Sequence, residues 1–226
     1  GNRVMYYTFN PSQPANDYLF SGCANLMADT LYVVSYYTRV YDADYPEKIR
    51  FGLASDIHPD AVLQVFETVE QQINYQYRRV MHAFTVEQDG QYYFFWHAQS
   101  PKYHRYIFVD DFALRKALHT DAYVHELRAT VPGLEFSGQT PLSIELRNLG
   151  REALPDGNLQ LLITNPLGEQ SQMQLSSPAL PRLGQFTLNA YADMNLHGRY
   201  NVQYTWQIEG EQDQGSNQGS RNLFHT

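Results

Sequence analysis

The chain has 226 residues, of which 14% are aromatic and only 18% are charged, and its formal net charge is −8. Tyrosine and phenylalanine prefer strands, so this composition favours an all-β protein, and the negative charge argues against a nucleic-acid partner. A single cysteine excludes an internal disulfide framework and a cysteine-based zinc cluster. No apolar run reaches the length of about 18 residues that a membrane-spanning helix needs.

Cys23, the single cysteine, follows Leu-Phe-Ser-Gly at 19–22, which is similar to the end of a bacterial lipoprotein signal. The residues before it, among them Pro11, Pro14 and Asp17, do not form the apolar stretch that such a signal requires. A lipid anchor at Cys23 is therefore disfavoured, which leaves a catalytic thiol or a packed side chain. We expect a mature or excised chain whose export signal or anchor, if any, lies elsewhere.

The first half is rich in aromatic strands. Alternation over 48–53 predicts a half-buried strand, whereas 60–72 is the one segment that could hold a short helix. Five aromatic residues follow one another at 92–96, so rings point to both faces of that strand. We expect Trp96 to lie on the core face, with Tyr93 and Phe95 on the other face.

The second half shows cleaner alternation with frequent turn residues. It predicts seven strands, at 122–131, 140–148, 158–164, 170–176, 184–192, 199–208 and 221–225. Seven short alternating strands in about 100 residues are typical of an immunoglobulin-like sandwich. Residues 115–121 are the expected linker, and the polar segment 209–220 is expected to be a mobile loop.

Two acidic groups stand out. In the strand 106–114, one of Asp110 and Asp111 would lie among apolar side chains whichever face is inward. A buried carboxylate is costly unless a cation or several donors satisfy it. The D-x-D-x-x-E pattern of Asp42, Asp44 and Glu47 lacks the glycine and the length of an EF-hand loop, so we expect a solvated hairpin tip.

Segments of the first half share an order and spacing with a known family; they are NDYLFSG (16–22), TLYVVSYYTRV (30–40), PEKIRFGLAS (46–55), FTVEQDGQYYFFWHAQS (84–100) and YIFVDDFAL (106–114). Together they resemble the cleaved-adhesin, or choice-of-anchor J, jelly-roll domains of surface proteins from Gram-negative anaerobes, which include the gingipain haemagglutinin modules. Fewer residues precede the NDYL strand than is usual in that family. The second half, with IELRNLG and GRYNVQYTW, resembles CARDB-type Ig-like modules.

The resemblance implies an all-β protein with a jelly roll at 1–116 and an Ig-like sandwich at 117–226. It implies a structural calcium ion, with Asp110 or Asp111 as ligand and Asp17 as a further oxygen donor. It also places Cys23 where a strand leaves its sheet, as a small, inert and partly buried residue.

The function we expect is non-catalytic. The pair of modules would bind glycans or host surface and matrix proteins, outside the cell or on its outer surface. Tyr93, Phe95 and the loop residue Tyr103 are the candidate ligand contacts. The alternative is a pair of accessory domains of a larger secreted peptidase or glycoside hydrolase, whose catalytic part lies outside this chain. No paired acid and base with a defensible spacing favours catalysis within it.

Overall fold

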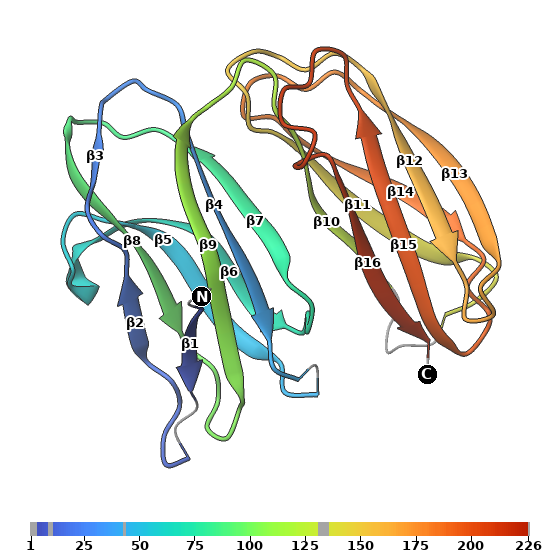
Figure 1. Ribbon diagram of the computed structural model, residues 1–226, viewed down its shortest axis with the longest axis horizontal. Helices are drawn as coiled ribbons and strands as arrows, with labels where there is room; N and C mark the ends of the chain where they lie inside the picture. The colour runs from blue at the N-terminus through green and yellow to red at the C-terminus, as the bar shows by residue number, and fades with distance from the viewer. Residues whose placement is uncertain (1–3, 9–10, 43, 131–135, 226) are drawn as a thin grey trace. The chain divides into compact units, whose positions relative to one another are not determined.

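The computed structural model describes residues 4–8, 11–42, 44–130 and 136–225, and these form strands, loops and one short 3₁₀ turn. The predicted all-β class is therefore confirmed. The chain divides into two compact units, Gly1–Lys116 and Ala117–Thr226, each a group of antiparallel strands (Figure 1). None of the helical structure in the described ranges is long and apolar enough to cross a membrane.

The first unit is a two-sheet sandwich. Its strands are β1 (Met5–Thr8), β2 (Asp17–Phe20), β3 (Ala24–Leu26), β4 (Tyr32–Val40), β5 (Glu47–Ala54), β6 (Val62–Gln72), β7 (Arg78–Phe84), β8 (Gly90–Ala98) and β9 (Tyr106–Lys116). One sheet has the order β1-β9-β4-β7 and the other β2-β8-β5-β6, with β3 also paired to β8. Because β2 and β3 pair with successive parts of β8, they act as one interrupted strand. The order then matches the eight-stranded jelly roll that we predicted.

Period-two alternation builds the core of this unit. Phe51 of β5 and Phe94 and Trp96 of β8 point inward and are almost completely buried. Gly52 lies on the other face of β5, where the sheet is tightly covered. A Cβ atom at Gly52 would collide with the backbone of β6 and would lie 2.8 Å from the Phe95 ring, so this position requires glycine.

The segment 60–72, the one segment that we thought could hold a short helix, is mostly a strand. Only Pro59–Ala61 forms a 3₁₀ turn, and β6 follows directly. The β-branched residues Val62, Val65 and Val69 favour an extended chain, and pairing with β5 along its length fixes it. Register shifts at three points along this pair bend the strand.

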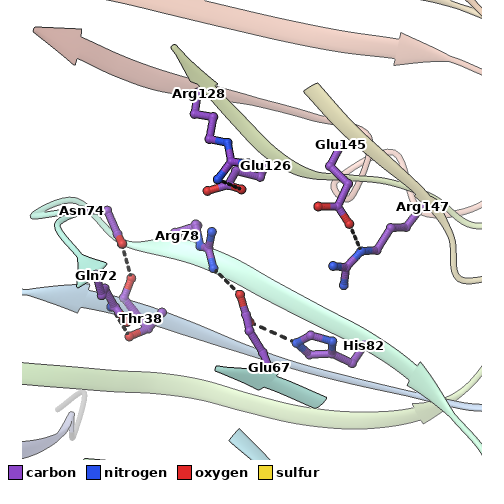
Figure 2. Close-up of polar contacts among 10 residues, drawn as sticks. All are labelled: Thr38, Glu67, Gln72, Asn74, Arg78, His82, Glu126, Arg128, Glu145 and Arg147. Atoms are coloured by element: carbon purple, nitrogen blue, oxygen red, sulfur yellow. Dashed lines mark hydrogen bonds and ion pairs between the residues drawn. The ribbon is translucent and has the colours of Figure 1, made fainter. Parts of the chain in front are cut away.

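A polar cluster joins β6 to β7. The Glu67 carboxylate accepts a hydrogen bond from Arg78 at 3.0 Å and lies 3.1 Å from the Nε2 atom of His82 (Figure 2). All three side chains are at most 14% exposed. Since β6 and β7 are edge strands of opposite sheets, this ion pair links the two sheets at the edge that these strands form.

The second unit is a sandwich of three strands against four. Its strands are β10 (Ala122–Ala129), β11 (Thr140–Asn148), β12 (Gly157–Thr164), β13 (Gln170–Ser177), β14 (Gln185–Ala192), β15 (Gly198–Gln207) and β16 (Gln218–His225). The sheets have the orders β10-β11-β14 and β13-β12-β15-β16, as expected for an Ig-like fold. Near the start of β15, the Tyr200 hydroxyl accepts a hydrogen bond from the Leu196 amide at 2.8 Å, which is the tyrosine corner of such sandwiches.

The polar loop before β16, which we expected to be mobile, is tied to the sandwich. Glu211 accepts a 2.6 Å hydrogen bond from the Ala122 amide, and Ser216 donates to the Ala122 carbonyl. Asn217 donates to the Trp206 carbonyl, and both Ser216 and Asn217 are buried. The prediction was wrong because side chains of a polar sequence can replace backbone pairing when they find partners.

Candidate functional site

The predicted split of the aromatic run in β8 is confirmed, but its outer face is not open. Phe95 is fully buried and His97 is 3% exposed, and the rings of Tyr18 and Phe20, their cross-strand neighbours in β2, pack beside them. Tyr93 is half-buried on the same face. Phe95, one of the residues predicted to contact a ligand, is therefore not accessible to one.

His97 is held neutral in this covered face. Its Nε2 atom lies 2.8 Å from the Asn16 side-chain oxygen, and the Tyr18 ring stacks on it at 3.9 Å. Burial lowers the pKa of His97 to about 4, and the positive charge of Arg50 adds to this effect against the opposing Asp17. The face is thus a closed aromatic layer that contains an uncharged imidazole at neutral pH.

Tyr103 lies apart from this layer. It is 57% exposed in the loop between β8 and β9, with a left-handed φ of 67°. The Lys102 ammonium lies 5.7 Å from its ring centroid. No ring contact joins Tyr103 to Tyr93 or Phe95, so the three predicted contact residues do not form one surface.

A β-bulge explains the two adjacent aspartates. Between Ser35 and Tyr37 the register of β4 with β9 shifts, and Asp111 adopts a left-handed φ of 47°. Asp110 is half-buried on the outer face, and its carboxylate accepts a 2.8 Å hydrogen bond from the Asp111 amide, while Asp111 is exposed. The expectation that one carboxylate lies among apolar side chains was wrong, because the extra residue lets both point away from the core.

The described residues offer calcium a sparse set of ligands. Asp17 is exposed in β2, in the opposite sheet from Asp110 and Asp111. Within the described ranges, no group of three or more His, Cys, Asp or Glu side chains is placed to hold a metal ion. An ion at the bulge would have to take most of its about six to eight oxygen ligands from carbonyls and water. Calcium there stays a prediction.

The D-x-D-x-x-E pattern is split by the structure. Asp44 is exposed in the turn as expected, but Glu47 opens β5 and is completely buried. Among the described residues, neither Glu47 carboxylate oxygen has a hydrogen-bond partner, and burial raises the pKa of Glu47 against the opposing effects of the nearby Ser100 and His104. A solvated tip was the wrong reading for Glu47, since the strand begins at Glu47, one residue earlier than the alternation over 48–53 indicates. Cys23, expected to be partly buried, is exposed between β2 and β3.

An open aromatic surface lies on the outer face of the other sheet, β1-β9-β4-β7. Tyr6 is 63% exposed, Tyr41 is 55% exposed and Tyr77 is 42% exposed, around the half-buried Tyr106 and Phe108. We call these five rings the aromatic platform. In Figure 1 the strands that carry its centre, β1, β9 and β4, lie side by side.

Strand register places the platform residues in rows. Tyr6, Phe108 and Arg39 are directly paired across β1, β9 and β4, so they share one face. Beside them, the Tyr106 ring is 6.1 Å from that of Tyr6 and 5.6 Å from that of Tyr41, both edge to face. The outcome is a continuous set of rings in contact on one face of the sheet.

Sequence reasoning missed this platform. Alternation does put Tyr106 and Phe108 on one face of their strand, which was the available signal. Their neighbours Tyr6 and Arg39 come from strands far away in the sequence, and only the sheet order brings them together. The left-handed Asp111 also reverses the inward face along β9, which a simple alternation does not predict.

No family model matches the chain, and a search of curated proteins finds no match. The search of solved structures does find matches. A CARDB domain from Pyrococcus furiosus, in complex with di-metal ions, is 16% identical with a TM-score of 0.39, over 49% of this chain and 92% of that one. β-Glucuronidase 2 of Bacteroides uniformis is 11% identical with a TM-score of 0.45, over 96% of this chain and 28% of that one. A GH2 β-galacturonidase from Eisenbergiella tayi bound to glycerol is 10% identical with a TM-score of 0.43, over 95% of this chain and 36% of that one. This chain thus spans about a third or less of the two glycosidases, and the likeness assigns it no activity.

Proposed function

We propose that this protein is a non-catalytic glycan-binding module pair, in which the aromatic platform of the jelly roll contacts the sugar. The observation that carries the proposal is the exposure of Tyr6, Tyr41 and Tyr77 on one face. Exposed rings are costly in water, and a group of them on one face commonly marks a binding surface. Pyranose rings present C–H groups that pack flat on aromatic faces, while their hydroxyl groups bond to tyrosine edges.

The likeness of the first unit to cleaved-adhesin jelly rolls supports a location outside the cell, as part of a surface or secreted protein. The Ig-like unit is then a spacer. The second function expected from the sequence, support of a hydrolase encoded in the same gene, would use the same platform to hold the enzyme at its substrate. The parent gene separates these roles, because a catalytic domain beside this chain favours the second.

The test is a glycan array probed with the intact chain and with Tyr6→Ala and Tyr41→Ala variants. Loss of one stacking ring should weaken binding roughly three- to tenfold. Tyr191→Ala is the matched control, because Tyr191 is 66% exposed on the second unit and lies outside the platform. Binding that is absent for the intact chain, or equal in all three variants, contradicts the proposal.

A further inference from the structure

One arginine is built into the aromatic platform. The Arg39 guanidinium carbon lies 4.0 Å from the centroid of the Phe108 ring and 5.3 Å from that of Tyr77. These two contacts cover the flat guanidinium with rings from neighbouring segments. Stacking uses the faces of the group and leaves its in-plane N–H donors available.

The N–H donors of the Arg39 guanidinium have few hydrogen-bond partners among the described residues. Within the part of the chain that the structure describes, their one hydrogen bond goes to the adjacent Val40 carbonyl at 3.4 Å, and no carboxylate lies within ion-pair distance of Arg39. In the same unit, Lys48 and Arg78 each pair with a glutamate. A half-buried arginine that is oriented but unpaired therefore points to a partner that is not part of the chain.

We propose that the platform selects a carboxylated sugar, a uronate, whose ring stacks on Tyr106 and Tyr41 while Arg39 binds its carboxylate. This inference rests on the proposed function. The planar guanidinium matches the two oxygens of a carboxylate, and such charge-assisted pairs are about twice as strong as neutral hydrogen bonds. The row of Tyr106 and Tyr41 lies two residues along the strands from the row of Arg39, which is about 6.7 Å at the usual rise per residue. A pyranose ring with its carboxylate spans about this distance.

One charge on the same face opposes an acidic ligand. Asp110 follows Phe108 by two residues and pairs across the sheet with Tyr37, so it shares the outer face with Arg39. It lies further along β9, away from Tyr106, and its carboxylate accepts the Asp111 amide. A bound uronate would extend toward Tyr106 and Tyr41, and Asp110→Asn should strengthen its binding modestly.

The experiment compares charged and neutral forms of one polymer by calorimetry, using the intact chain. The probes are polygalacturonate, its methyl ester, hyaluronan, and dextran sulfate as the sulfate arm. We expect binding to polygalacturonate or hyaluronan, and at least tenfold weaker binding to the ester. Arg39→Gln should lower affinity for the acid roughly tenfold to a hundredfold and leave affinity for the ester unchanged.

Arg50→Gln is the matched control, because it removes the same charge from the outer face of the opposite sheet, beside His97. Arg39→Lys keeps the charge without the planar donor and should recover little of the loss. Equal binding of acid and ester by the intact chain overturns the inference and leaves glycan binding standing. Binding to dextran sulfate alone also overturns it, and failure to bind any glycan on the array removes both proposals.

Discussion

Asn148, the asparagine of the IELRNLG segment, organises one end of the Ig-like unit. It is 1% exposed at the end of β11. Its side-chain amide donates to the carbonyls of Glu152, Leu180 and Pro181 at 2.8, 3.2 and 3.0 Å, and its oxygen accepts the Gly150 amide at 2.9 Å. One side chain thus adds four hydrogen-bond contacts to two loops that are also joined by the Leu154–Leu180 bridge.

The cost of Asn148→Ala follows from these contacts. The amide has two N–H groups, so its three carbonyl contacts amount to two full hydrogen bonds, and the Gly150 amide adds a third. At about 1 kcal/mol net per bond, with buried groups left unsatisfied, the free energy of unfolding should fall by about 3–4 kcal/mol. Asn148→Asp should cost more, because it brings a buried negative charge against three carbonyl oxygens.

Urea unfolding measures this loss. The two tryptophans, Trp96 and Trp206, lie in different units, so in a Trp96→Phe background the fluorescence reports the Ig-like unit alone. With a slope of about 1.5 kcal/mol per molar urea, the midpoint should fall by about 2 M. Asn158→Ala, at an exposed position of β12, is the control and should change stability by less than about 0.5 kcal/mol. A loss at Asn148 no larger than the control refutes the reasoning.

Three further predictions concern pH, packing and metal. Burial, with a smaller effect of the nearby Asp121, raises the pKa of Glu211 from 4.5 to about 7. The folded state therefore binds this proton more tightly than the unfolded state does. The contribution of Glu211 to the free energy of unfolding should be fully present below pH 4.5 and should fall by about 1–2 kcal/mol between pH 4.5 and 7, after allowance for solvent screening. Unfolding curves at pH 4.5 and 7.5 test this, and Glu211→Gln should flatten the difference. Gly52→Ala should destabilise the jelly roll by about 1–3 kcal/mol through overpacking and so lower its melting temperature. Gly22→Ala is the control, because a Cβ atom at Gly22 meets no atom within 4 Å, and it should leave the melting temperature unchanged. EDTA should lower the melting temperature of the jelly roll and calcium restore it, and an unchanged curve counts against an ion at Asp110 and Asp111.

Much of the fold follows from the sequence because burial on one face of a strand leaves a period of two. Leu142, Ile144 and Leu146 show it in β11, and turn residues mark where such strands end. Alternation fails where the backbone itself departs from the regular strand. A bulge at Asp111 leaves no compositional trace, since aspartate is an ordinary residue of loops and strand ends.

The site was less predictable than the fold for a related reason. A run such as Tyr92–Trp96 predicts rings on both faces of its strand, but it does not reveal on which face neighbouring side chains will bury them. Tyr18 and Phe20, cross-strand neighbours in β2, pack beside Phe95, which is fully buried, whereas Tyr6 on the outer face of the other sheet is 63% exposed. Exposure is a property of the whole sheet order, so it cannot be read from the aromatic residues alone.

The bulge in β9 connects the core to the proposed binding surface. Before it, Ile107 and Val109 point inward, which leaves Tyr106 and Phe108 on the outer face. After it, Phe112 points inward and packs on Phe94 and Trp96, with ring centroids 5.2 and 5.4 Å apart. Without the extra residue, a strand that buried Phe112 would have to bury Tyr106 and Phe108 as well. The inserted residue therefore allows one aromatic strand to fill the core at one end and to present its rings beside Arg39 at the other.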